Sequence, residues 1–183
     1  VSREAERLGG VVEDLLLLAR ADSGDRPLRR ERCYLDDLAL EAAESARVMA
    51  EQKGVALEVH DFEEAPVDGD PGLLRQLALI LLDNAIQFTP RGGAVRLAVT
   101  ADGAGPAVEV RDTGAGIAPE HLPHVFERFY RGDPARGRAE GAGLGLAIAR
   151  WITELHGGEI ALTSEVGRGT TVTVRLPPAV SSS

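Results

Sequence analysis

The stretch Asp112-Thr113-Gly114-Ala115-Gly116-Ile117 follows a strand-like run and places a carboxylate directly before a flexible turn. Further along the chain, Gly141-Ala142-Gly143-Leu144-Gly145-Leu146 opens a helix-like run. The free backbone N–H groups at a helix N-terminus attract phosphate. Together the two glycine-rich segments predict a nucleotide pocket, in which Asp112 faces a base and the second segment faces phosphates.

Each segment alone is also typical of a simple turn or of a tight connection before a helix. A dinucleotide-binding loop needs Gly-x-Gly-x-x-Gly early in a strand–turn–helix unit. Here the sixth position is Leu146, and the segment lies late in the chain. A phosphate-binding loop would need Gly-Lys-Ser or Gly-Lys-Thr, which the sequence lacks. The predicted pocket is therefore neither of these two common kinds.

Composition narrows the class of protein. The 183 residues, 44% of them hydrophobic, are enough for one domain with a core and an appendage. A formal net charge of −9 and a pI near 5.0 disfavour nucleic acid as the main partner. The single cysteine, Cys33, excludes an intrachain disulfide, and no Cys/His metal spacing is present, which favours a reducing compartment. The apolar run Val11–Ala19 is too short to span a bilayer.

The sequence pattern alternates between helices and strands. Residues 2–21 predict a helix with a coiled-coil-like seam formed by Leu8, Val11 or Val12, Leu15 and Leu18. This seam favours pairing with another helix or chain, although packing on its own domain remains an alternative. Further helices are expected over 36–52 with Asp36 as the cap, over 70–89 and over 144–155, with one or two short helices in 119–129.

Strands are expected at 31–35, 55–60, 94–100, 107–111, 159–163 and 170–176. The strands cluster as adjacent hairpins, and the helices fall before and between them. This order predicts a two-layer α/β (α+β) sandwich with a mixed sheet rather than a doubly wound parallel sheet.

The helix over 71–89 carries two polar side chains of interest. Leu74, Leu77, Leu81 and Ala85 share its apolar side, whereas Asn84 and Gln87 are three residues apart and share another. Asn84 could bond a neighbouring backbone group. Its oxygen could equally coordinate Mg²⁺, which prefers oxygen ligands and substrate phosphates. From the residues alone, both alternatives stay open.

Five motifs in order resemble those of sensor histidine kinases. Leu82-Asp83-Asn84-Ala85-Ile86-Gln87-Phe88-Thr89-Pro90 resembles the N box, and Asp112–Ile117 resembles the G1 box. Phe126-Glu127-Arg128-Phe129-Tyr130-Arg131 resembles the F box, Gly141–Ile148 the G2 box, and Gly167-Arg168-Gly169-Thr170 a final glycine box. Residues 1–22 look like the second helix of the dimerisation hairpin in the same family. The resemblance implies the Bergerat-type ATP-binding sandwich shared by gyrase, Hsp90, histidine kinases and MutL.

The resemblance also implies roles for individual residues. Asp112 would accept the adenine amino group, Asn84 would hold Mg²⁺ between the phosphates, and Arg131 would face the γ-phosphate. Gly141, Gly143 and Gly145 would wrap the phosphates beneath a mobile lid at 131–141, which Phe126 and Phe129 would anchor while also packing in the core. The remaining nucleotide-binding positions implied are Gly114, Gly116, Ile117, Gln87, Phe88, Leu144, Leu146 and Thr170.

The chain departs from the family pattern at three positions of the N box. Ile80 stands where a second Asn is common, Gln87 where a basic residue is common, and Phe88 where an aromatic hydroxyl is common. These changes remove a positively charged side chain that could contact the phosphates, and they also remove polar contacts. They weaken the expectation of tight phosphate binding more than the identity of the pocket.

None of the four histidines has the sequence context of the family's phosphoacceptor. His156 is expected at a helix end, and His60, His121 and His124 on the surface or in the core. The acceptor helix is therefore expected upstream of Val1.

The resemblance divides the chain into four parts: part of the dimerisation hairpin (1–22), a linker (23–30), the catalytic ATP-binding domain (31–177) and a disordered tail (178–183). It implies ATP and Mg²⁺ as cofactors, a response-regulator receiver domain as partner, and homodimerisation through the upstream hairpin. It places the domain in the cytoplasm, attached to a membrane only through other segments. A non-catalytic ATP-binding module, or an ATP-driven clamp of the Hsp90 or MutL type, remains the alternative.

Overall fold

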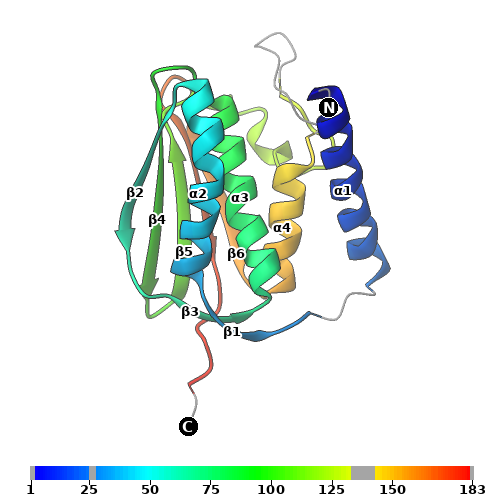
Figure 1. Cartoon of the computed structure of the whole chain (residues 1–183), viewed down its shortest axis with the longest axis vertical. Helices are drawn as coiled ribbons and strands as arrows, with labels where there is room; N and C mark the ends of the chain where they lie inside the picture. The colour runs from blue at the N-terminus through cyan, green and yellow to red at the C-terminus, as the bar shows by residue number, and fades with distance from the viewer. Residues whose placement is uncertain (1–2, 25–27, 133–142, 182–183) are drawn as a thin grey trace.

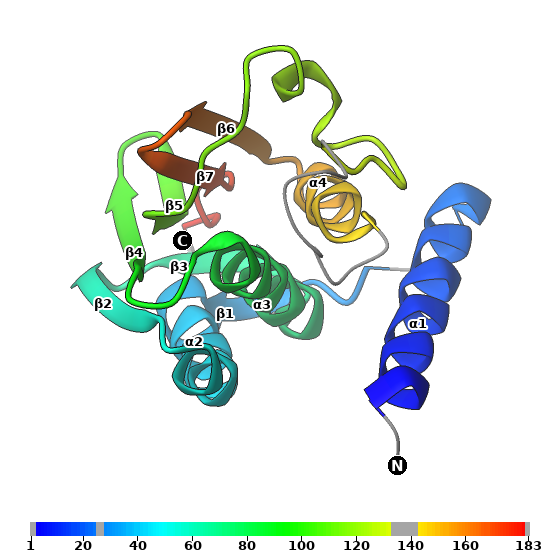
Figure 2. The same ribbon diagram turned by 90° about the horizontal axis from the view of Figure 1, so that it is seen from above.

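The computed structural model describes residues 3–24, 28–132 and 143–181. A sheet forms one layer, and three helices pack on one of its faces to form the other (Figures 1 and 2). The helices are α1 Arg3–Ser23, α2 Leu35–Lys53, α3 Pro71–Phe88, α4 Gly145–Leu155 and the short 3₁₀ helix η1 Leu122–His124. The strands are β1 Glu31–Tyr34, β2 Ala56–Phe62, β3 Pro66–Gly69, β4 Ala94–Asp102, β5 Gly105–Asp112, β6 Glu159–Glu165 and β7 Gly169–Arg175. The two-layer sandwich predicted from the sequence is confirmed.

The five-stranded sheet has the order β2-β4-β5-β7-β6, and β5 lies at its centre. β2 pairs with β4 in parallel, while β4–β5, β5–β7 and β6–β7 are antiparallel, so the sheet is mixed as predicted. The central strand ends at Asp112. The Asp112 carboxylate therefore lies at the end of the sheet where the chain turns from β6 to β7.

A second, two-stranded sheet pairs β1 with β3. β3 is not predicted from the sequence, because it has only four residues and its two ends, Pro66 and Gly69, are residue types that are depleted in strands. The role predicted for Asp36 is also wrong. Tyr34 occupies the N-cap position of α2 without a side-chain bond, and Asp36 instead accepts a hydrogen bond from the Ala65 N–H at 2.9 Å.

Helix α3 is the centre of the core. Pro71 stands in its first turn, and the Asp70 side chain caps it by accepting from the Leu73 N–H at 3.1 Å. The α3 side chains that are buried are Leu73, Leu74, Leu77, Ala78, Leu81, Leu82, Ala85 and Ile86. At its C-terminal end, Lys53 of α2 donates to the carbonyls of Ile86 and Gln87. Charge and packing thus fix the end of α3 that carries the N-box residues.

Helix α1 lies beside α4 at the edge of the helical layer (Figure 2). Leu17 and Leu18 are buried, and Asp22 forms a two-pronged ion pair with Arg128 through contacts of 2.7 and 2.9 Å. The remaining large apolar side chains of α1 stay exposed: Leu8, Val12, Leu15 and Leu16. The helix therefore packs on its own domain through one end, and its exposed stripe keeps the prediction of a helical partner open. None of the described helices has the length and apolar character needed to cross a bilayer.

His156 joins the ends of α3 and α4. It is only 3% exposed, its Nε2 accepts from the Asp70 N–H at 3.0 Å, and its Nδ1 donates to the Ile152 carbonyl at 2.7 Å. Both bonds require a neutral ring with the proton on Nδ1. Burial lowers the pKa of His156, consistent with this assignment. The predicted helix-end histidine is thus also a structural polar group of the core.

We expect His156→Ala to lower the free energy of unfolding by about 2–4 kcal/mol, because it leaves a cavity and an unsatisfied N–H on Asp70. In the wild type, the folded state favours neutral His156, so its contribution is complete above the unfolded pKa of about 6.5. That contribution is lost as the pH falls from there through the lower folded value. Urea unfolding between pH 5 and 8 measures both effects. His60→Ala, which removes an exposed ring, is the control, and equal stabilities of the two variants would contradict this role.

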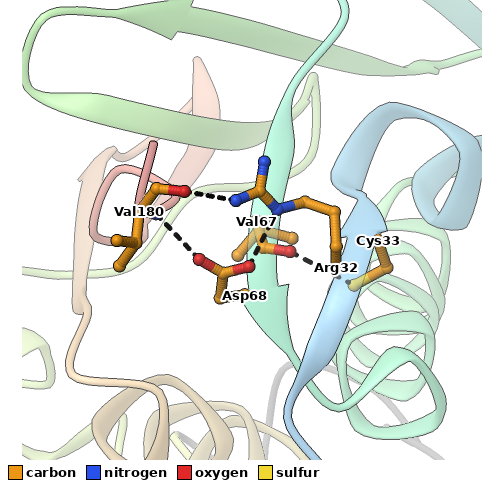
Figure 3. Close-up of polar contacts among 5 residues, drawn as sticks. All are labelled: Arg32, Cys33, Val67, Asp68 and Val180. Carbon is orange, nitrogen blue, oxygen red and sulfur yellow. Dashed lines mark hydrogen bonds and ion pairs between the residues drawn. The ribbon is translucent and has the colours of Figure 1, made fainter. Parts of the chain in front are cut away.

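The chain after β7 is held by a cross-strand pair of the small sheet (Figure 3). Arg32 of β1 contacts Asp68 of β3 at 2.8 Å and donates to the Val180 carbonyl, while the Val180 N–H donates to Asp68 Oδ2 at 2.8 Å. Cys33 donates weakly to the Val67 carbonyl at 3.7 Å. Val180, which lies in the segment 178–183 predicted to be a disordered tail, thus makes contacts through both of its backbone groups, and no side-chain pattern reveals them.

We expect the Val180 amide to exchange with solvent at least about tenfold more slowly in the wild type than in Asp68→Ala, because the carboxylate protects it. The Val180 bond, followed by Arg32, lowers the pKa of Asp68, so this protection is lost as the pH falls through that lowered value. Because the pair is on the surface, the free energy of unfolding should change by less than about 1 kcal/mol. Asp37→Ala on exposed α2 is the control, and equal exchange rates would refute the contact.

Candidate functional site

Asp112 is the charged group at the centre of the candidate site. It is 6% exposed, and its Oδ1 accepts from the Gly114 N–H at 2.8 Å and from the Thr170 N–H at 3.2 Å. Oδ2 receives no hydrogen bond from the described residues. Among those residues no fully buried side-chain oxygen lacks a partner, so Oδ2 retains access to solvent. The carboxylate is fixed through one oxygen and presents the other as an acceptor.

Burial raises the pKa of Asp112, and the two backbone bonds oppose that shift. Charge at this position therefore costs folding energy, and a ligand that donates a hydrogen bond to Oδ2 would offset part of that cost. Buried carboxylates whose ionised form is disfavoured by the fold are typical of functional sites.

The turn after Asp112 needs glycine at 116. Gly116 has a φ of +72°, and a Cβ there would lie 2.1 Å from the Glu165 carbonyl oxygen. The segment is also tied to β6, because the Ile117 N–H donates to Ser164 Oγ at 2.8 Å. The predicted positions Gly114, Gly116, Ile117 and Thr170 are thus brought together around the end of β5.

Ser164 also belongs to the site, although the sequence does not predict it. It accepts from Ile117, donates to the Gly169 carbonyl at 2.9 Å, and lies 2.8 Å from Thr170 Oγ1. Ser164 and Thr170 line a cavity of about 310 Å³ together with Asp112. Ser164 lies in a strand with an ordinary alternating pattern, and this pattern gives no sign of its role. Only the pairing of Ser164 with Thr170 across the hairpin places it here.

The C-terminal part of α3 forms the other side of the site. Asn84 is half-buried, and its side chain makes no hydrogen bond to any described residue. One turn earlier, Ile80 faces the start of α4, since a Cβ on Gly145 would lie 3.4 Å from Ile80 Cγ2. Burial raises the pKa of the adjacent Asp83 to about 6, although part of this residue remains exposed. Because Ile80 and Asn84 are four residues apart, they share one side of α3, and Ile80 on that side contacts the start of α4.

Gln87 is half-buried and Phe88 is 52% exposed, so neither is a core residue. The Phe88 carbonyl lies close to Gly114, where a Cβ would be only 2.5 Å from its oxygen. The end of α3 and the turn after β5 are therefore in direct contact. Here the predicted N-box and G1-box segments meet.

The start of α4 is locked to the segment before it. Gly143 has a φ of +74°, its carbonyl accepts from the Phe129 N–H at 3.0 Å, and a Cβ on it would lie 2.7 Å from the Tyr130 carbonyl. Leu144 is buried, while Gly145 and Leu146 are half-buried. Gly141 and most of the predicted lid lie outside the described residues. Arg131 is exposed beside this junction.

The two predicted anchors of the lid, Phe126 and Phe129, differ in how far their side chains are buried. Phe126 is half-buried, but Phe129 is 58% exposed and adopts a φ of +60°. The expectation that Phe129 packs in the core is therefore wrong. Its N–H donates to the Gly143 carbonyl, while its ring faces solvent.

The residues present fit a magnesium nucleotide in their chemistry. Among the described residues, no three His, Cys, Asp or Glu side chains gather as a protein metal site. A single carboxamide oxygen at Asn84 suits Mg²⁺, which keeps several waters and takes its other ligands from substrate phosphates. The roles predicted for Asn84, Arg131 and the glycines stay predictions.

Comparison with known proteins identifies the fold family. Residues 69–180 match the family described as "Histidine kinase-, DNA gyrase B-, and HSP90-like ATPase". The chain is 38% identical over 178 residues to the sensor-like histidine kinase SenX3 of Mycobacterium tuberculosis, covering 97% of this chain and 43% of SenX3. It is 39% identical over 175 residues to the sensor histidine kinase CusS of Escherichia coli, covering 95% of this chain and 36% of CusS.

Among solved structures, full-length ShkA in complex with AMPPNP superimposes with a TM-score of 0.81 at 29% identity. That match covers 99% of this chain and 38% of ShkA. The chain thus spans less than half the length of these relatives. The fold, the ordered motifs and these similarities agree. The chain belongs to the histidine kinase-, DNA gyrase B- and HSP90-like ATPase family, and it is similar to the ATP-binding region of sensor histidine kinases.

Proposed function

We propose that this chain binds Mg·ATP between the end of β5, the C-terminal half of α3 and the start of α4. The observation that carries the proposal is Asp112, a buried carboxylate with one oxygen bound by two backbone N–H groups and the other open. An ionised carboxylate only accepts hydrogen bonds, so it matches the amino group of adenine. Asn84 would hold Mg²⁺, which neutralises charge on the phosphates.

In the intact protein, the γ-phosphoryl group would pass to a histidine on an upstream helical hairpin. The imidazole nitrogen forms the new N–P bond as the bond to the β-phosphate oxygen breaks and ADP leaves. Arg131 would stabilise the charge that develops on the transferred group. A response-regulator aspartate would then take the phosphoryl group. Four exposed apolar side chains of α1 support dimerisation through that hairpin: Leu8, Val12, Leu15 and Leu16. The domain would lie on the cytoplasmic side of a membrane, to which other segments of the intact protein would attach it.

A second candidate is a non-catalytic ATP-binding module of the same fold. Ile80, Gln87 and Phe88 favour it, because they replace the polar and basic side chains common in active members. Both candidates bind ATP, so nucleotide binding alone does not distinguish them.

Incubation with γ-labelled ATP separates the two candidates. The present chain should acquire no acid-labile label, because none of its histidines has the acceptor context. A longer chain that carries the upstream acceptor helix should acquire phosphohistidine. Label on His60, His121, His124 or His156 would contradict the proposal. Failure of every acceptor-containing chain to acquire label, despite ATP binding, would favour the non-catalytic module.

A further inference from the structure

Tyr130 stands where two candidate phosphate-binding segments meet. On one side it is followed by Arg131. On the other, its carbonyl packs against Gly143, which also accepts the Phe129 N–H. The backbone at 129 and 130 therefore sets the position of Arg131 relative to the start of α4.

The backbone at this junction is strained. Phe129 is a bulky residue with a φ of +60°, a backbone region that such residues rarely adopt because it is strained. Its ring is largely exposed, so burial of the ring does not compensate for this strain. Contacts made by its neighbours must hold the conformation in place.

The side chain of Tyr130 supplies such a contact. Its hydroxyl lies 2.5 Å from His121 Nδ1, and its ring lies 5.3 Å from the ring of His124 between centroids. His121 is itself fixed by a turn, since its N–H donates to the Ala118 carbonyl and its carbonyl accepts from the His124 N–H, each at 3.0 Å. Tyr130 is thus held through its hydroxyl by His121, and the residue before it is held by the hydrogen bond from the Phe129 N–H to the Gly143 carbonyl.

We propose that His121, acting through the Tyr130 hydroxyl, is a positioning residue for Arg131 in phosphoryl transfer. This inference rests on the proposed function, in which Arg131 faces the γ-phosphate. A guanidinium stabilises a transition state only when it is already aimed at the developing charge. Without the His121 bond, residue 129 can relax from its left-handed conformation, and Arg131 rotates away with it.

The test uses the longer chain with its upstream acceptor and measures the rate of autophosphorylation against ATP concentration. Tyr130→Phe and His121→Ala should each lower kcat about tenfold and change KM for ATP less than about twofold, because the contact acts on the transition state. The double variant should be no slower than either single variant, since both remove the same bond. His121→Asn, which returns an acceptor oxygen near the position of Nδ1, should restore most of kcat.

His124→Ala is the matched control. It removes the histidine ring that lies near the Tyr130 ring, but it leaves the hydrogen bond between the Tyr130 hydroxyl and His121 in place. It should leave kcat within about twofold of the wild type. Additive losses in the double variant, a change in KM alone, or no rescue by His121→Asn would overturn the positioning role while leaving the proposed function intact. Absence of phosphohistidine in the wild type would instead overturn the proposed function, and the positioning role with it.

Discussion

Asp112→Asn is expected to weaken ATP binding about 10- to 150-fold without destabilising the fold. The loss corresponds to one hydrogen bond to a charged acceptor, about 1.5–3 kcal/mol. An asparagine oxygen can still accept from Gly114 and Thr170, so the turn should remain intact. What changes is the second oxygen, which becomes an amide donor facing the donor on adenine.

The direction of the pKa shift of Asp112 decides how this residue affects the free energy of unfolding at neutral pH. Burial raises the pKa of Asp112 above its unfolded value, so its contribution to stability is complete below about pH 3.9 and is lost as the pH rises through the folded value. At neutral pH the ionised group therefore costs stability, and the asparagine variant removes that cost. We expect equal or higher stability in thermal unfolding at pH 7.

Calorimetric titration with ATP, paired with thermal unfolding, measures both parts. Asp102→Asn is the control, because it removes a charge from an exposed ion pair with Arg175. This control should bind ATP like the wild type. Unchanged ATP affinity in Asp112→Asn would remove the assignment of Asp112 to adenine. A large loss of stability would instead make Asp112 a structural residue.

Asn84→Ala is expected to abolish the Mg²⁺ dependence of ATP binding and to lower phosphoryl transfer about 10²–10³-fold, the range for one preorganised electrostatic group. The fold should tolerate the change. Asn84 is half-buried, has no hydrogen bond to the described residues, and lies in a helix where alanine is the better helix former. ATP titrations with and without Mg²⁺ give the first quantity, and labelling of the longer chain gives the second.

Gln76→Ala is the matched control for Asn84. It removes a half-buried carboxamide from the same helix, next to the α1 groove lined by Leu16 and Leu17. Its Mg²⁺ dependence should equal that of the wild type. If Asn84→Ala keeps the same response to Mg²⁺, the metal is held by other groups.

The sequence predicts most of the fold because each main element carries a local signal. Asp70-Pro71 marks the start of α3, and alternation marks β4 and β5. β3 was missed because its signal is not local, as its four residues form a strand only when β1 lies beside them. The contacts of Val180 could not be predicted for the same reason, since its partners Arg32 and Asp68 are distant in sequence.

The residues of the candidate site also differ in whether a local sequence signal predicts them. Asp112 and the glycines could be predicted, because a carboxylate followed by a glycine-rich turn is recognisable within one short segment of the sequence. Ser164 and His121 could not, because their roles depend on which strand or turn lies opposite. The exposure of Phe129 could not be predicted either, because its positive φ and its hydrogen bond to Gly143 leave no local sign in the sequence.

The central claim is that this chain holds a magnesium adenine nucleotide around Asp112 and Asn84. Calorimetric titration of the wild type with ATP and with GTP, each with and without Mg²⁺, tests it most directly. Because adenine presents an amino donor where guanine presents a carbonyl acceptor, Asp112 should select ATP over GTP by at least about a hundredfold. The account predicts one ATP site per chain, tightened by Mg²⁺. Equal affinity for ATP and GTP, or no binding of ATP, would contradict it.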